Sequence, residues 1–355
     1  MSRFLTQTGV SSSSPARYFA MTLLRSLLFS LGLAFTMIAP LPAVAQVNIM
    51  APFNVGGAMD GGVVKIGDGI AYADGPRKRL DVYTPQNPSG SAPVVMFIYG
   101  GAWRSGARED YTFVGHALAA AGFVVVIPDY RVYPEVTYPG FLEDNAQALR
   151  WVEDNVARFG GDPQRVFLAG HSAGAYNAVM LSLDHSFQRE YGVTIPIRAV
   201  AGISGPYNFY PFEYNEVRQT FGSAPNPEGT QPVNLVTSAA PPMLLVTGTH
   251  DPIVRMQNTE VMAERLRAQG IWVTERYYEG FGHMEPVMAM GQLLRFRMPV
   301  LQDVVEFFTR FGAFPSGAPR PNFTPEPPEG VTTAEADPLV DVIERLDDVL
   351  APLAD

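Results

Sequence analysis

The sequence of 355 residues contains no cysteine and only five histidines. Without cysteine, the chain has no disulfide bond, no thiolate-bound zinc site and no cysteine nucleophile. The histidines show neither the H-E-x-x-H spacing nor any similar spacing of metal ligands. We therefore expect no catalytic metal, and any nucleophile must be of another residue type.

Basic residues are in the minority, with 25 Lys and Arg against 35 Asp and Glu and a formal net charge of −10. An excess of negative charge repels the phosphates of nucleic acids and the head groups of anionic membranes. We therefore expect neither of them as a partner.

The sequence also lacks an apolar run long enough to span a membrane comfortably. Residues 1–45 combine three arginines and no acidic residue with an apolar run over 27–39 and the site Ala43-Val44-Ala45. This order predicts a secretory signal peptide over 1–45 and hence an exported protein, periplasmic or secreted; an uncleaved anchor is the alternative. Cleavage would leave 22 basic and 35 acidic residues, a formal charge of −13, and we expect no stable membrane insertion afterwards.

Strands and helices alternate through the middle of the chain. Continuous apolar runs predict strands buried on both faces, as in a parallel sheet, over 93–99, 122–128, 166–168, 199–204 and 242–247. Helices are expected over 111–121, 141–159, 257–269 and 298–311, a further strand over 271–277, and antiparallel edge strands before residue 85. The pattern predicts an α/β fold, a doubly wound, mostly parallel sheet flanked by helices, in a domain over 46–314.

The pentapeptide Gly170-His171-Ser172-Ala173-Gly174 follows the third buried strand and precedes a helix rich in Ala, Val, Met and Leu. A G-x-S-x-G sequence between a strand and a helix is typical of a sharp turn that exposes a nucleophilic serine, and its glycines leave room for the tight backbone. The alternative is a turn serine that only caps the helix. We expect Ser172 to be a nucleophile.

A serine hydroxyl needs a base to take its proton and a group to orient that base. Asp251 follows the strand over 242–247, and His283 lies in the loop after the strand over 271–277. Taken singly, Asp251 could be a helix cap and His283 an ordinary loop histidine. The order Ser172, Asp251, His283, each after a strand, instead predicts a catalytic triad. We interpret His171 and His250 as walls of the site at most.

Acyl transfer also needs hydrogen-bond donors for the oxyanion that develops on the carbonyl oxygen. One is expected to be the backbone N–H of Ala173, directly after the nucleophile. The others are expected in the glycine loop, Tyr99-Gly100-Gly101-Ala102-Trp103, from the N–H groups of Gly101 and Ala102. A simple glycine turn is the alternative for these residues.

Aromatic residues are dense between residues 205 and 241, where ligand-facing loops emerge from such a sheet. We predict that Trp103 and Tyr207 contact the substrate; the alternative is that these rings only cover the core. After Phe314, six prolines between 315 and 328 predict an extended linker, followed by an amphipathic helix over 337–350. That helix would dock on the body of the domain or on another copy of the chain, which would make a homodimer.

Six motifs lie between Leu80 and Phe311: Tyr99–Trp103, Pro128–Arg131, Phe159–Pro163, Gly170–Gly174, Gly248–Asp251 and Gly282–His283. With them, this part of the sequence resembles the esterase/lipase branch of the α/β-hydrolases. It is most similar to carboxylesterases and kynurenine-formamidase-like enzymes that carry H-G-G-x-W. Tyr99 replaces the usual histidine, so we expect a different hydrogen bond to shape the glycine loop.

The resemblance implies the α/β-hydrolase fold and hydrolysis of small or aryl carboxylic esters without a cofactor. The substrate would be a small-molecule ester, cleaved through a covalent acyl-enzyme. An arylformamidase-type amidohydrolase acting on N-formylkynurenine is one alternative, and a non-catalytic binding protein with the hydrolase fold is another. Export argues against the first, and the intact set of Ser172, Asp251 and His283 argues against the second.

Overall fold

The computed structural model describes residues 50–51, 53–54, 60–87 and 90–314. The chain divides into two compact units, residues 1–52 and residues 53–355, and the predicted site residues all lie in the second. The predicted signal peptide over 1–45, the linker over 315–328 and the helix over 337–350 lie outside the described residues.

The second unit contains an eight-stranded sheet in the order β1-β2-β4-β3-β5-β6-β7-β8. The first two strands, β1 (Val63–Ala71) and β2 (Arg79–Pro85), form an antiparallel hairpin, and β2 runs antiparallel to β4. The strands from β3 onward run parallel to one another. They are β3 (Ala92–Ile98), β4 (Val124–Pro128), β5 (Gly161–His171), β6 (Ile197–Ile203), β7 (Met243–Gly248) and β8 (Val273–Tyr278). The predicted α/β fold with a mostly parallel sheet is confirmed.

The central strands form the core because helices cover both of their faces. Every residue of β3, β4 and β7 is buried, as their continuous apolar sequences predicted. The strands at the two edges, β1 and β8, keep several side chains exposed. The edge strands therefore carry the polar residues that a central strand cannot accommodate.

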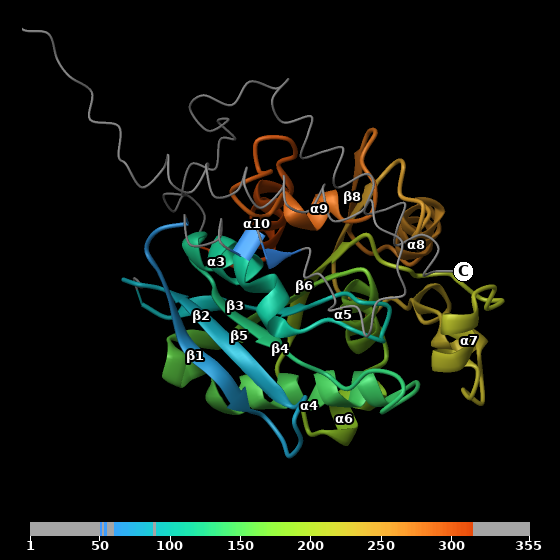
Figure 1. Cartoon of the computed structure of the whole chain (residues 1–355), viewed down its shortest axis with the longest axis horizontal. Helices are drawn as coiled ribbons and strands as arrows, with labels where there is room; N and C mark the ends of the chain where they lie inside the picture. The colour runs from blue at the N-terminus through green and yellow to red at the C-terminus, as the bar shows by residue number, and fades with distance from the viewer. Residues whose placement is uncertain (1–49, 52, 55–59, 88–89, 315–355) are drawn as a thin grey trace, which may run out of the picture. The chain divides into compact units, whose positions relative to one another are not determined.

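Helices flank the sheet on two sides. In Figure 1, α3 and α10 lie on one side of the sheet, and α4 and α6 lie on the other. The helices predicted over 111–121, 141–159, 257–269 and 298–311 are α3 (Thr112–Ala120), α4 (Gly140–Asn155), α8 (Gln257–Ala268) and α10 (Val300–Arg310), and the helix predicted after Ser172 is α5 (Ala173–Leu183). The described residues also form α6 (His185–Glu190), α7 (Asn215–Phe221), α9 (Glu285–Met288) and the short 3-10 helices η2 (Arg108–Tyr111), η3 (Val156–Phe159), η4 (Glu228–Thr230) and η5 (Pro232–Asn234).

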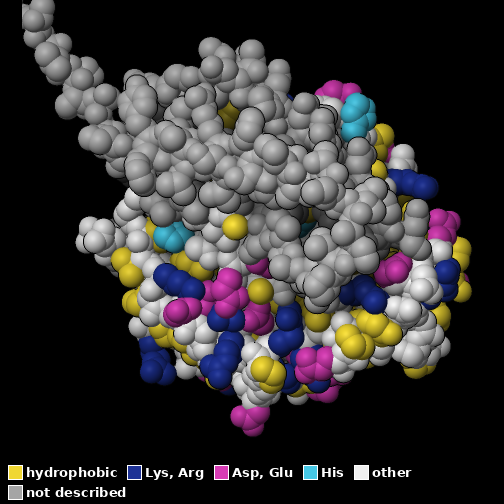
Figure 2. All heavy atoms as spheres, in the orientation of Figure 1, with side chains coloured by type: hydrophobic (Ala, Val, Ile, Leu, Met, Phe, Trp, Pro, Cys, Tyr) yellow, Lys and Arg dark blue, Asp and Glu magenta, His cyan; other side chains and the backbone are white. Residues whose placement is uncertain are grey.

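Charges of both signs lie close together over β1 and β2, where Figure 2 shows Lys and Arg side chains beside Asp and Glu side chains. Lys65 on β1 lies 2.6 Å from Asp68 and 2.7 Å from the buried Asp81 on β2. Ion pairs therefore support the backbone ladder of this hairpin.

Candidate active site

Ser172 lies at the apex of a sharp turn between β5 and α5. Its backbone has φ 53° and ψ −122°, and residues with a side chain rarely adopt such a positive φ. A Cβ at Gly174 would overlap the carbonyl oxygen of Ile98, so α5 begins against the end of β3 only because residue 174 is glycine. The turn thus stores backbone strain at the serine, as observed at many functional sites.

The predicted triad residues lie within hydrogen-bonding distance of one another. Ser172 Oγ is 2.8 Å from His283 Nε2, and His283 Nδ1 is 2.8 Å from Asp251 Oδ2. A carboxylate can only accept a hydrogen bond, so Nδ1 carries the imidazole proton and Nε2 presents its lone pair to the serine hydroxyl. The arrangement is that of a base ready to remove a proton from Ser172.

Two loops hold the acid and the base together. Asp251 follows β7 and His283 follows β8, two strands that pair up to Gly248 and Tyr278. Beyond the strands, the N–H of Thr249 donates to the carbonyl of Tyr278, and the N–H of His250 donates to the carbonyl of Phe281, both at 3.0 Å. The parallel pairing therefore extends into the loops and places the two side chains side by side.

The predicted oxyanion donors lie on two elements. Ala173 is the first residue of α5, so its N–H has no carbonyl partner within the helix. Gly101, Ala102 and Trp103 have φ of 130°, 50° and 57°, a left-handed run that is unfavourable for the last two residues. The carbonyl of Gly101 closes this turn by accepting the N–H of Ser105 at 3.1 Å.

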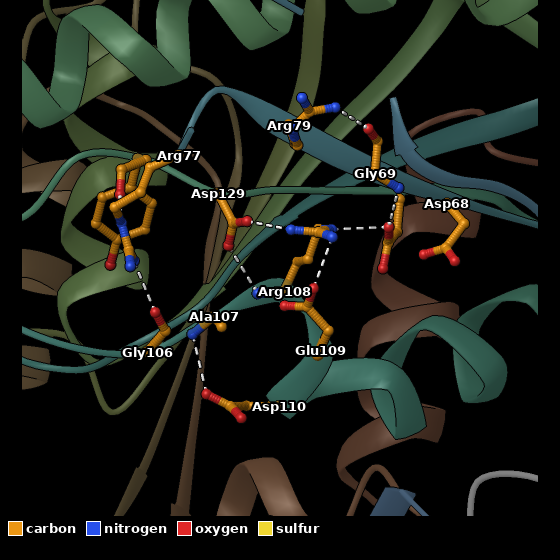
Figure 3. Close-up of polar contacts among 12 residues, drawn as sticks. Asp68, Gly69, Arg77, Arg79, Gly106, Ala107, Arg108, Glu109, Asp110 and Asp129 are labelled. Atoms are coloured by element: carbon orange, nitrogen blue, oxygen red, sulfur yellow. Dashed lines mark hydrogen bonds and ion pairs between the residues drawn. The ribbon is translucent and has the colours of Figure 1, made fainter. Parts of the chain in front are cut away.

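Tyr99 forms the hydrogen bonds at the position where the similar enzymes carry histidine. Its hydroxyl donates to Asp129 Oδ1 at 3.0 Å and accepts from Arg77 Nη2 at 2.9 Å. Arg77 also donates to the carbonyl of Gly106 at 2.7 Å, just beyond the glycine loop. Figure 3 shows this contact and the neighbouring ion pair of Arg108 with Asp129. One half-buried guanidinium therefore binds the first residue of the glycine loop and the backbone just beyond its last residue.

Trp103 and Tyr207 are both buried. The indole of Trp103 packs edge-on against Phe221, with ring centroids 4.7 Å apart, and its N–H donates to Asn177 Oδ1 at 3.0 Å. Tyr207 is fully buried, next to the backbone of Gly202. Contact of either ring with a substrate stays a prediction, and for Tyr207 it would require its neighbours to move.

Two side chains at the site were missed or undervalued from the sequence. From the sequence, His171 was interpreted as no more than a wall of the site, and Tyr111 was not named as a candidate. In the structure Tyr111 Oη lies 3.0 Å from His171 Nδ1, a contact between residues 60 positions apart. Because the contact forms only through space, no local sequence signal could have revealed it.

Among the described residues, no group of three His, Cys, Asp or Glu side chains could hold a metal ion. Within the same part of the chain, no helix is long and apolar enough to cross a membrane.

The fold and the arrangement of the site define the class as an α/β-hydrolase of the esterase/lipase superfamily. Two solved structures share this fold. One is esterase B from Lactobacillus rhamnosis, with a TM-score of 0.63 and 18% identity over 83% of this chain and 96% of that one. The other is esterase 2 from Thermogutta terrifontis, with a TM-score of 0.58 and 23% identity over 69% of this chain and 94% of that one.

Within that class, the chain belongs to the BD-FAE family, whose model matches residues 80–266. It is 32% identical over 238 residues to isoprenylcysteine alpha-carbonyl methylesterase ICME from Arabidopsis thaliana, covering 61% of this chain and 56% of that protein. It is 34% identical over 220 residues to esterase LipC from Mycobacterium tuberculosis, covering 56% of this chain and 54% of that protein. The chain thus spans little more than half the length of these curated relatives.

Proposed function

We propose that the protein is a serine carboxylesterase that hydrolyses small or aryl carboxylic esters. The observation that carries this proposal is the line of two 2.8 Å contacts from Ser172 through His283 to Asp251. The names of its relatives, a methylesterase and an esterase, agree with this chemistry. No cofactor enters the reaction, because the serine itself is the nucleophile.

In the first half of the reaction, Ser172 Oγ attacks the ester carbonyl carbon while His283 Nε2 takes the hydroxyl proton. The N–H groups of Gly101, Ala102 and Ala173 stabilise the negative charge on the carbonyl oxygen. The tetrahedral intermediate then breaks its bond to the alcohol oxygen, which receives the proton from His283. An acyl group remains on Ser172, and the alcohol leaves.

In the second half, water attacks the acyl carbon and gives its proton to the same Nε2 atom. The intermediate collapses, His283 returns the proton to Ser172 Oγ, and the carboxylic acid leaves. Asp251 holds the imidazole in one tautomer during both halves and stabilises the imidazolium.

The substrate is proposed to contact Trp103 and, once the neighbours of Tyr207 have moved, that ring as well, and both rings favour an apolar or aromatic portion of the ester. The proposed localisation is outside the cytoplasm, periplasmic or secreted, after cleavage of residues 1–45. This localisation is supported by the basic start, the short apolar run and the A-x-A site. The helix predicted over 337–350 is the proposed contact of a homodimer.

The test compares wild type with Ser172→Ala on a series of p-nitrophenyl esters and on N-formylkynurenine. Wild type should cleave the esters and spare the formamide, and Ser172→Ala should lose about 10⁶-fold in kcat. Ser186→Ala, an exposed serine on α6, is the matched control and should keep full activity. Cleavage of the formamide alone would favour the amidohydrolase. A wild type that turns over none of these substrates would favour the binding protein.

A further inference from the structure

A chain of hydrogen bonds connects the glycine loop to the loop that carries His283, and it runs through His171, the residue before Ser172. The N–H of Gly100 lies 3.4 Å from Tyr111 Oη, and Tyr111 Oη lies 3.0 Å from His171 Nδ1. On the other side of the ring, His171 Nε2 lies 3.2 Å from the backbone carbonyl oxygen of His283. We call these four residues and their contacts the His171 bridge.

The carbonyl at one end determines the direction of every hydrogen bond in the bridge. A carbonyl oxygen can only accept, so the proton of the neutral His171 ring is on Nε2. Nδ1 therefore accepts, and the hydroxyl of Tyr111 donates to it. The lone pairs of Tyr111 Oη are then available for the N–H of Gly100. Each donor in the bridge thus has one acceptor, and no second arrangement satisfies all of them.

Burial keeps the bridge in this neutral form. His171 is 1% exposed and Tyr111 is 4% exposed. Burial, assisted by the neighbouring His283, lowers the pKa of His171 well below its usual value, and burial raises the pKa of Tyr111. The ring centroids of His171 and His283 are 5.1 Å apart. A neutral His171 therefore adds no positive charge beside the imidazolium that forms on His283 during turnover.

The glycine loop needs such an attachment. Ala102 and Trp103 occupy left-handed backbone conformations that cost energy unless the surroundings impose them. A Cβ on Gly100 would lie 2.9 Å from His171 Nδ1 and 3.0 Å from the Cβ of Ser172, so the loop backbone lies directly against the bridge and the nucleophile. Hydrogen-bond donors stabilise an oxyanion only when they are held in place before the charge develops.

We propose that His171 and Tyr111 are positioning residues. They hold the glycine loop and the backbone of His283 in fixed positions relative to Ser172. Each side chain acts through the backbone group that it binds, Tyr111 through the N–H of Gly100 and His171 through the carbonyl of His283. This inference rests on the proposed ester hydrolysis. It assigns His171 a role beyond that of a wall, and it gives a role to Tyr111.

The central experiment is a double-mutant cycle with Tyr111→Phe and His171→Phe, measured as kcat and KM on the p-nitrophenyl ester that wild type cleaves best. Each single variant should lower kcat about tenfold and leave KM nearly unchanged, because each removes an interaction that preorganises the site. The double variant should lose little more than the worse single variant, since either change already breaks the bridge. Tyr83→Phe, which removes another buried hydroxyl, is the matched control and should retain kcat.

Two conservative variants separate the two ends of the bridge. His171→Asn places an amide oxygen near the position of Nδ1, and His171→Gln places an amide nitrogen near the position of Nε2. Adding Tyr111→Phe should cost about tenfold in kcat in the Asn background, where its acceptor remains, and almost nothing in the Gln background. A cost of Tyr111→Phe that depends on the acceptor at residue 171 distinguishes positioning from a general loss of packing.

A fluorophosphonate label on Ser172 reports whether each variant has folded. The variants should take up one label per chain, as wild type does, but more slowly. Tyr111→Phe removes a single oxygen atom, so it tests the proposal even if a His171 variant fails to fold. The positioning proposal would be overturned by an unchanged kcat in Tyr111→Phe. It would also be overturned if the losses in kcat multiplied to about a hundredfold in the double variant. A wild type that cleaves no ester and takes no label would instead contradict the proposed function itself.

Discussion

At the scale of single residues, Asp251 divides two tasks between its two carboxylate oxygens. Oδ2 binds His283 Nδ1, while Oδ1 accepts the backbone N–H groups of Ile253 and Val254 at 2.9 and 2.8 Å. The sequence left open that Asp251 caps the following helix, but α8 begins at Gln257 with Met256 as its N-cap, so Oδ1 stabilises the loop instead. The role of Asp251 as the orienting acid stays a prediction. The backbone donors immobilise the carboxylate that is proposed to hold the base.

Replacing Asp251 with Asn should separate these tasks. The amide oxygen can still accept from the backbone, so the denaturant midpoint should change little. The amide N–H cannot accept the proton of Nδ1, so His283 would adopt the wrong tautomer and kcat should fall roughly 10³- to 10⁴-fold. The measurement is kcat on a p-nitrophenyl ester together with a urea titration. Asp184→Asn, at the N-cap of α6, serves as the control.

The candidate triad was recognisable from the sequence because each member follows a strand in a fixed order. Ser172 has its flanking glycines, and Asp251 and His283 each come just after an apolar or alternating run. Tyr111 and Arg77 were not recognisable, because their partners are reached only across the fold. Local pattern finds the groups that are expected to react, whereas the groups that hold them depend on tertiary contacts.

At the scale of elements, the turn at Ser172 depends on the close approach of α5 to the end of β3. A Cβ at Gly174 would overlap the carbonyl oxygens of both Ile98 and Tyr99, which belong to the backbone and cannot turn aside. The helix would have to move away from the sheet, and the serine would move with it.

Gly174→Ala should therefore destabilise the protein by about 1–3 kcal/mol and reduce kcat, because overpacking shifts the backbone. Urea unfolding followed by tryptophan fluorescence measures the first effect, and ester hydrolysis measures the second. Gly61→Ala is the matched control, since a Cβ there meets nothing within 4 Å. Equal stability of the two variants would show that α5 can be displaced without cost.

The helices and strands with clear periodicity were predicted within a few residues, whereas α7 and the start of β5 were not. The region over 205–241 contains α7, of which Thr220 and Phe221 are the buried residues. A single buried turn leaves no helical period in the sequence. The start of β5 was placed at Val166, but the strand begins at Gly161, which pairs with Ala92. Its first five residues include the polar Asp162, Gln164 and Arg165, and only the pairing with β3 shows that this segment belongs to the sheet.

At the scale of the whole molecule, the parallel sheet brings distant parts of the sequence to one edge. His171 pairs with Ile203, Ile203 pairs with Val246, and Gly248 pairs with Tyr278. The loops that carry Ser172, Asp251 and His283 therefore emerge at the same level. The alternation of apolar runs and helices was enough to predict this arrangement, but not the hydrogen bonds that connect the loops.

The buried, neutral His171 also makes the folding stability depend on pH. Its pKa in the folded protein lies well below the ordinary value, so below about pH 6.5 the unfolded chain binds a proton that the folded chain does not. The free energy of unfolding should fall on acidification by up to about 1.4 kcal/mol per pH unit from this group. His171→Gln removes the contribution.

The measurement is urea unfolding of wild type and His171→Gln at pH 7.5 and pH 5.5. Because the glutamine does not titrate, the stability difference between the two proteins should shift in favour of the variant by about 1.4 kcal/mol at the lower pH. A difference that is the same at both pH values would mean that His171 is able to take up a proton in the folded state.

The contact of Arg77 with Tyr99 and Gly106 has a consequence for how this protein can be shortened. Arg77 lies in the hairpin between β1 and β2, three residues before the family match begins at residue 80. A fragment that began at residue 80 would keep the parallel strands and Ser172, Asp251 and His283, yet lose the guanidinium of Arg77, which binds Tyr99 and Gly106. The shortest fragment worth expressing should therefore begin ahead of β1, so that the hairpin that carries Arg77 is complete.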